Sequence, residues 1–160
     1  MKVKGLAISG IVAALYVAVS LIVAPFGFTN VQFRISEMFN HLVIFNKKFI
    51  FAIVLGVFIT NLFSPLGAYD LVFGVAQSII ALSITIFSAK FIKGIVQRMI
   101  FNTIVFTFTM FIIAFELNLA LELPFLFTWL TVAVGEFVVM AVGIPVMLAL
   151  NKRLNFEKLL

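Results

Sequence analysis

The chain has 160 residues, of which 64% are hydrophobic and 11% are charged, whereas soluble domains are about half apolar and a quarter charged. A water-soluble fold of this size cannot bury so much apolar surface, so the sequence predicts an integral membrane protein. The absence of cysteine excludes disulfides, thiolate metal sites and cysteine nucleophiles. The net charge of +5 comes from small basic clusters between apolar runs, and the basic tracts typical of nucleic-acid binding are missing.

Apolar runs, each expected to form a helix, follow one another along the chain. They cover residues 5–25, 33–46, 49–64, 68–90, 99–116 and 125–151. About 20 apolar residues span the hydrocarbon core of a bilayer, and the second run is short for a full span. The sequence therefore predicts an all-α integral membrane protein, a single membrane domain over residues 1–160 built as a bundle of six transmembrane helices.

The first run carries small residues at four-residue spacing, namely Gly10, Ala14 and Ala18. Small residues at this spacing let another helix approach closely in lipid, although ordinary packing within the chain explains the pattern equally well. A basic start followed by an apolar run also resembles a signal peptide. The run is too long for a usual signal core, however, and the Pro-Phe-Gly sequence at 25–27 is a poor cleavage site, so we interpret it as a transmembrane helix.

The second run is unusually polar for such an apolar chain. Arg34, Glu37 and His41 are each about one helical turn from the next and therefore share a face. An Arg–Glu pair that only holds two helices together is one explanation, and a binding role is the other. His41 is the single histidine, so a histidine-based metal site is not expected.

Polar residues also flank the Ser-Pro-Leu-Gly turn at 64–67. Asn61 ends the third run, whereas Tyr69 and Asp70 begin the fourth, and Gln77 lies two helical turns after Asp70. A carboxylate at the start of a helix also interacts with the positive end of the helix dipole. Asp70 is therefore either a simple helix cap or part of the outer wall of a pocket.

The last run contains Trp129 and, seven residues further on, Glu136, which helical geometry stacks beneath it. A carboxylate at that depth costs about 2.5–3.5 kcal/mol on insertion scales, so Glu136 should face a cavity or a partner. Before this run, Glu116, Glu122 and their neighbours are expected to form an acidic loop.

The loops alternate in charge along the chain. The positive-inside rule places the basic loops, and with them both termini, in the cytoplasm. The cytoplasmic side then carries Lys2, Lys4, Lys47, Lys48, Lys90, Lys93, Arg98, Lys152, Arg153 and Lys158, and the opposite side carries Asp70, Glu116, Glu122 and a single base, Arg34.

With this topology, the polar side chains of four helices meet in the outer half of one bundle, which predicts a binding pocket open to the outside. No phosphate-binding loop, zinc-protease motif or nucleophile elbow occurs, so catalysis is not expected. A filter sequence and detectable inverted repeats are also missing, which argues against a pore and against a self-sufficient secondary transporter.

Three segments carry a resemblance to a known family: VQFRISE at 31–37, TNLFSPLGAYDLVFG at 60–74 and VGEFVVMAVGIP at 134–145. They resemble the queuosine-precursor transporter (QueT) family, the substrate-binding S components of energy-coupling factor (ECF) transporters, over nearly the whole chain. The resemblance implies a six-helix S component without ATPase activity or cofactors. It would dock on an ECF module of one transmembrane coupling protein and two cytoplasmic ATPases, through the Ala14–Ala18 motif of the first helix.

The resemblance also implies a deazaguanine precursor of queuosine as substrate: the aminomethyl form, the cyano form, or queuine. The expected binding residues are Arg34, Glu37, Asn61, Tyr69, Asp70, Gln77, Trp129 and Glu136. Glu136 is the first choice and Asp70 the second for accepting the ring N–H and amino donors, and Tyr69 or Trp129 would stack on the ring. Another vitamin-like solute, or a scaffold without transport function, remains an alternative.

Overall fold

A computed structural model describes residues 2–27 and 32–160, and their ordered segments are helical. The elements are α1 (Val3–Ile22), α2 (Ala24–Gly27), the 3₁₀ helix η1 (Ile35–His41), α3 (Leu42–Phe45), α4 (Phe49–Asn61), the π-helical η2 (Asp70–Gly74), α5 (Val75–Ser88), α6 (Ile95–Leu121), α7 (Phe125–Leu154) and the 3₁₀ helix η3 (Phe156–Lys158).

Four helices in the described part of the chain are long and apolar enough to cross a membrane: Val3–Ile22, Asp70–Ser88, Ile95–Leu121 and Phe125–Leu154. Large apolar side chains such as Phe51, Phe108 and Leu126 are more than half exposed on their outer faces, as expected where lipid is the solvent. The runs expected over 33–46 and 49–64 form the shorter helices Ile35–Phe45 and Phe49–Asn61. The all-α class is thus confirmed, whereas the count of six spans stays a prediction.

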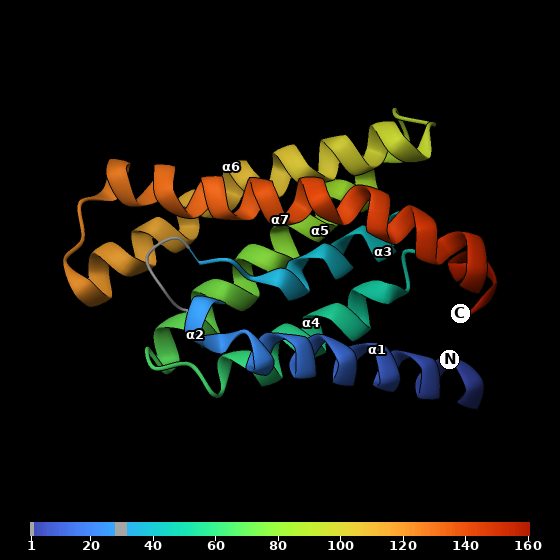
Figure 1. Cartoon of the computed structure of the whole chain (residues 1–160), viewed down its shortest axis with the longest axis horizontal. Helices are drawn as coiled ribbons and strands as arrows, with labels where there is room; N and C mark the ends of the chain where they lie inside the picture. The colour runs from blue at the N-terminus through green and yellow to red at the C-terminus, as the bar shows by residue number, and fades with distance from the viewer. Residues whose placement is uncertain (1, 28–31) are drawn as a thin grey trace.

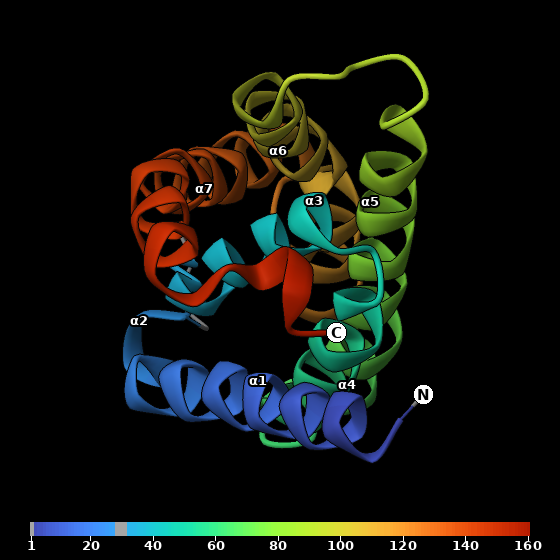
Figure 2. The same cartoon turned by 90° about the vertical axis from the view of Figure 1, so that its right-hand side faces the viewer.

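The long helices enclose the short segment η1–α3. Viewed end-on, α1 and α4 form one side of the molecule, α5, α6 and α7 form the rest, and the η1–α3 segment runs through the middle (Figure 2). η1 contacts α7 and α1, and α3 contacts α5 and α6. Because it is surrounded on all sides, this segment buries nearly every side chain that it carries from Ser36 to Phe45.

Both termini lie at the same end of the bundle, together with the turn between α3 and α4 and the loop between α5 and α6 (Figure 1). These are the basic segments of the sequence, and the loops that join α4 to η2 and α6 to α7 lie at the opposite end. The chain therefore separates its charged loops in space as the sequence predicts. The position of both termini at one end of the bundle agrees with the prediction that they share one side of the membrane, and the cytoplasmic location stays a prediction.

Close approach of the helices depends on glycine at two crossings. A Cβ atom on Gly56 of α4 would lie 2.8 Å from the Cβ of Tyr16 on α1, and one on Gly143 of α7 would lie 2.8 Å from the Cβ of Met38. Contacts this short do not occur between real side chains, so any larger residue would push the helices apart. In lipid, where packing rather than hydrophobicity drives helix association, such contacts bring α4 against α1 and α7 against the central segment.

Candidate functional site

Four buried carboxyl groups and one guanidinium gather inside the bundle. Glu37 of η1, Asp70 of η2, Glu116 of α6 and Glu136 of α7 are at most 3% exposed, and the Arg34 side chain is 10% exposed. The negative charges of Asp70, Glu37 and Glu116 all lie within electrostatic reach of the Arg34 guanidinium. Charges inside an apolar bundle are costly and usually functional, so this cluster is the candidate site.

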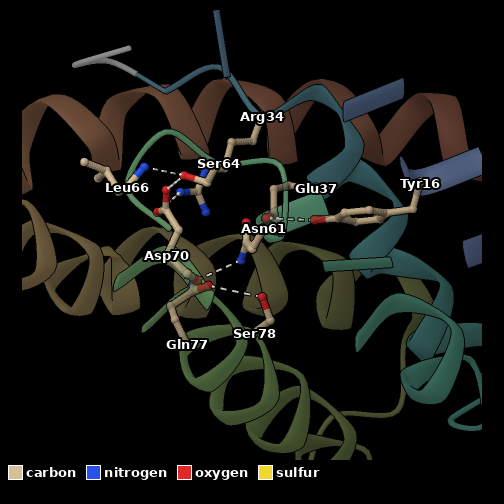
Figure 3. A network of polar contacts seen from close by, with 9 residues as sticks. All are labelled: Tyr16, Arg34, Glu37, Asn61, Ser64, Leu66, Asp70, Gln77 and Ser78. Atoms are coloured by element: carbon tan, nitrogen blue, oxygen red, sulfur yellow. Dashed lines mark hydrogen bonds and ion pairs between the residues drawn. The ribbon is translucent and has the colours of Figure 1, made fainter. Parts of the chain in front are cut away.

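Asp70 is held at the first residue of a π-helical turn. Ser64 Oγ donates a hydrogen bond to its Oδ2, and the Arg34 guanidinium forms an ion pair with Oδ1 at 3.7 Å. Figure 3 shows the Arg34 side chain reaching down from its own segment toward the Ser64–Asp70 turn. π-turns inside helices are rare and often mark functional sites. Asp70 is thus a buried partner of Arg34 and more than a simple helix cap.

The π-turn is fastened to α4 by one side chain. Asn61 donates from Nδ2 to the backbone carbonyl of Asp70 at 2.9 Å, across the turn between the two helices (Figure 3). The amide fits because residue 74 is glycine: a Cβ on Gly74 would lie 2.5 Å from Asn61 Nδ2. Asn61, a predicted binding residue, therefore already donates one hydrogen bond within the chain, and this bond shapes the site.

Glu37 is bound by groups other than Arg34. Tyr16 of α1 donates its hydroxyl to Glu37 Oε1 at 3.0 Å, and Asn40 Nδ2 donates to Oε2. The predicted pairing of Arg34 with Glu37 along one helix face is replaced by the pairing of Arg34 with Asp70, because η1 begins after Arg34 as a 3₁₀ helix. Tyr16 was not predicted, although a tyrosine in an otherwise apolar helix is a signal that its hydroxyl needs a buried partner.

The position of Glu116 differs most clearly from the prediction made from the sequence. It was expected in an acidic loop after a helix ending at residue 116, but α6 continues to Leu121 and buries Glu116 completely. Its carboxyl group lies within electrostatic reach of Asp70 and Arg34. The apolar residues that follow it, Leu117 and Leu119 to Leu121, continue the helix and were the signal in the sequence.

Glu136 has an unusual feature. Within residues 2–27 and 32–160, neither oxygen of its carboxyl group has a hydrogen-bond partner, although the group is almost wholly buried, whereas the buried Glu116 carboxyl forms a side-chain hydrogen bond with Asp70. Glu136 lies within reach of the charges of Glu37 and Arg34. Buried polar groups are normally satisfied, so an unsatisfied carboxyl group within electrostatic reach of a guanidinium indicates a place where something else binds.

A small cavity lies beside the cluster, between α1, η1 and α4. Its volume is about 20 Å³, which is room for about one water molecule. It is lined by Tyr16, Ser20, Val23, Gly27, Arg34, Ser36, Glu37, Val57, Thr60 and Asn61. Ligand pockets usually measure a few hundred Å³, so this cavity is smaller than the space that a ring-sized ligand occupies.

Gln77 lies deeper, where its Nε2 donates to Thr109 Oγ1 of α6 at 2.9 Å. His41 is satisfied in the core, since its two ring nitrogens lie 2.9 Å from the Met140 carbonyl oxygen and 3.1 Å from Asn102 Nδ2. His41 is thus a packing residue of the bundle interior. Among the described residues, no group of three or more His, Asp or Glu side chains is arranged to hold a metal ion.

The structure does not bring the two predicted stacking residues to the cluster. Tyr69 is 44% exposed at the end of the bundle. Trp129 packs against Phe108 and Phe111 of α6 and donates its indole N–H to the Phe108 carbonyl at 3.2 Å, in an open apolar groove on the outside. Helical spacing predicts that Trp129 lies above Glu136 along α7, but it does not predict which way each side chain points.

The small residues of α1 face outward. Gly10, Ala14 and Ala18 are exposed, whereas the inward face is formed by Gly5, Ser9, Ala13, Tyr16 and Ser20. A Cβ atom on Gly10 would meet no atom within 4 Å. The stripe is therefore not packed against the described residues, 2–27 and 32–160, which argues against packing within the chain as its explanation.

Comparison with known proteins decides the family. The sequence pattern described as "QueT transporter" matches residues 6–152. The chain belongs to the QueT transporter family. It is 35% identical over 157 residues to the protein named queuosine precursor transporter QueT of Lactococcus lactis subsp. cremoris (strain MG1363), covering 92% of each chain. No solved structure matches the chain.

Membership of this family, together with the four long apolar helices, makes the protein a multi-pass protein of the cell membrane with a role in transport. A transporter family also implies that the chain is not a catalytic enzyme. The buried cluster around Arg34 is thus the candidate substrate site of a QueT family transporter.

Proposed function

We propose that the chain is the substrate-binding S component of an ECF importer and that it takes up a deazaguanine precursor of queuosine from outside the cell. The observation that carries the proposal is the buried carboxyl group of Glu136, which has no hydrogen-bond partner in the described chain and lies within electrostatic reach of Arg34. The name of the Lactococcus relative supports a queuosine precursor as the ligand.

The chemistry of the ring fits these groups. A deazaguanine presents a ring N–H and an amino group side by side, which one carboxylate accepts in bidentate fashion, whereas its carbonyl oxygen needs a donor. Glu136 remains our choice for the carboxylate because both of its oxygens are free, whereas Asp70 already binds Ser64 and Arg34. Arg34 is the donor for the carbonyl, since its Nε has no hydrogen-bond partner within the described chain and its Nη2 is engaged only by the ion pair with Asp70 at 3.7 Å.

The remaining polar residues shape the pocket. Asn61 and Gln77, two of the expected binding residues, each already donate one hydrogen bond, to the Asp70 backbone and to Thr109. For ring stacking, Tyr16 is better placed than Tyr69 or Trp129, because it lines the cavity next to Glu37. Binding would widen this cavity by moving α1 away from η1, since its present volume of about 20 Å³ cannot hold a bicyclic ring.

The outer face of α1 is the proposed docking surface for the transmembrane coupling protein. Gly10, Ala14 and Ala18 leave an exposed strip of small side chains along a helix that would face lipid, and such strips allow close helix contact. The two ATPases of the ECF module would lie on the cytoplasmic side. The basic loops at the end of the bundle that holds both termini would face them under the positive-inside rule.

Ligand-dependent stabilisation of the purified chain tests the proposal. A bound ligand raises the free energy of unfolding by RT ln(1 + [L]/Kd), so deazaguanines should raise the melting temperature, whereas unrelated vitamins should not. A scaffold protein would respond to neither, and an S component for another solute would respond only to that solute. A melting temperature that stays constant across the deazaguanines would refute the proposed substrate.

Substitution of Glu136 tests the site itself. Glu136→Gln keeps the shape but replaces an acceptor by a donor, so we expect it to weaken deazaguanine binding about tenfold to a hundredfold, the effect of losing a charged hydrogen bond. Glu122→Gln is the matched control, since Glu122 is exposed after the end of α6. Equal affinities of the two variants would mean that Glu136 does not contact the ring.

A further inference from the structure

The small cavity between α1, η1 and α4 is lined by one hydroxyl group that is left without a partner. Thr60 of α4 is 6% exposed, and its Oγ1 atom forms no hydrogen bond with any of residues 2–27 and 32–160. Tyr16 and Ser20 line the same cavity, but both donate their hydroxyl protons within the chain. Because buried polar groups are normally satisfied, the Thr60 hydroxyl requires a partner from outside the chain.

Other threonines of the bundle satisfy their hydroxyl groups on their own helix. Thr103 Oγ1 donates to the Met99 carbonyl at 3.0 Å, and Thr109 Oγ1 donates to the Phe106 carbonyl at 3.2 Å. Such bonds to the preceding turn are the usual arrangement for a threonine inside a helix. Thr60 lies in the last turn of α4 and makes no bond of this kind, so its hydroxyl is available to a group placed in the cavity.

The size of the cavity and its second unpartnered residue indicate what this group is. The volume of about 20 Å³ is room for about one water-sized group. Arg34 also lines the cavity, and its Nε has no hydrogen-bond partner in the part of the chain that the structure describes. In so small a space, a single oxygen atom lies close to both side chains. Since a guanidinium can only donate, whereas a hydroxyl can donate or accept, the atom that suits both is a hydrogen-bond acceptor.

We infer that Thr60 is a specificity-determining residue, which donates a hydrogen bond to the ring carbonyl oxygen of the substrate beside the Arg34 guanidinium. This inference rests on the proposed function, in which Arg34 is the donor to that oxygen, and it adds a second donor. The carbonyl is adjacent to the ring N–H assigned to Glu136, and Arg34 lies within electrostatic reach of Glu136, so one ring can engage both ends of the site. A ring with an amino group in place of the carbonyl oxygen would direct donors at the Arg34 donors and would be rejected.

The experiment measures the affinity of the full chain, in detergent or nanodiscs, for the aminomethyl deazaguanine, the cyano deazaguanine and queuine. With the compound that the native chain binds most tightly, Thr60→Val should weaken binding about twofold to tenfold, the effect of losing one neutral hydrogen bond. Thr60→Ser keeps the hydroxyl and should keep most of the native affinity. Thr107→Val is the matched control, because Thr107 Oγ1 is also unpartnered in the described chain but Thr107 lines the outer apolar groove; it should leave affinity unchanged.

A second measurement separates a contact with the ligand from a structural role. Valine has nearly the shape of threonine and replaces a hydroxyl that has no partner, so the melting temperature of ligand-free Thr60→Val should equal or exceed that of the native chain. A lower melting temperature would show that the hydroxyl is used within the chain and would overturn the inference.

A third measurement identifies the atom that Thr60 contacts. The 6-thio analogue of the same compound keeps the ring N–H and amino donors but replaces the carbonyl oxygen by sulfur, a weak acceptor. Thr60→Val should therefore weaken the oxygen compound more than the thio analogue. Equal weakening of the two compounds, or native affinity in Thr60→Val, would overturn the inference and leave the proposed function intact. Failure of the native chain to bind any of the three deazaguanines would overturn the proposed function and the inference with it.

Discussion

Gly74→Ala tests whether the contact between α4 and the π-turn shapes the candidate site. An added Cβ would lie 2.5 Å from Asn61 Nδ2, whereas ordinary contacts begin at 3.4 Å, so the amide must retreat by 0.9 Å (3.4 − 2.5). The same nitrogen donates to the Asp70 carbonyl at 2.9 Å. A retreat of this size takes the hydrogen bond outside its range and leaves buried polar groups unsatisfied.

The expected loss of stability follows from these contacts. A buried group left without its hydrogen bond costs about 1–3 kcal/mol, and residual overpacking costs about 1–3 kcal/mol. Alanine regains about 1 kcal/mol through its higher helix propensity. We therefore expect Gly74→Ala to lower the free energy of unfolding by about 3 kcal/mol.

Unfolding in mixed detergent micelles can be followed by the fluorescence of Trp129, the single tryptophan, which packs on aromatic side chains of α6. Gly10→Ala is the matched control, because its Cβ would meet no atom within 4 Å and should leave stability unchanged or slightly raised. In an Asn61→Ala background, Gly74→Ala should cost little, since the clashing amide is gone. A Gly74→Ala chain as stable as the native protein, or equally destabilised in both backgrounds, would refute this account of the π-turn.

Two further predictions concern topology and docking. Because the chain has no cysteine, single cysteines introduced at Lys48, Lys90 and Gly67 can be labelled in cells. We expect an impermeant reagent to reach position 67 alone. Labelling at position 48 or 90 would contradict the six-span topology. Ala14→Trp should abolish co-purification with the ECF module, while the isolated chain still binds ligand. The control Ala149→Trp, on the exposed face of α7, should leave assembly intact. If Ala14→Trp lost ligand binding together with assembly, the stripe would instead be assigned to internal packing.

The sequence by itself determined that the protein is helical and that lipid is its solvent. Apolar runs long enough to span a bilayer can be recognised without tertiary information, because each charged residue placed in lipid carries its own free-energy cost, which depends little on the rest of the fold. It also marked Glu136 as a residue that should face a cavity or a partner and named Arg34 and Asp70 as candidate pocket residues, and in the structure Arg34 forms an ion pair with Asp70 and lies within electrostatic reach of Glu136.

Only the tertiary structure decided which partners they have. Arg34 pairs with Asp70 of another segment rather than with Glu37 of its own, because the central segment enters the bundle as a 3₁₀ helix surrounded by α1, α6 and α7. Helical periodicity could not show that Trp129 turns outward, since the outer groove of α6 and α7 is formed by residues distant in sequence. Glu116 was assigned to a loop because its charge suggested the end of a helix, yet α6 continues past it, and the packing of α6 against the centre of the bundle makes it a buried part of the site.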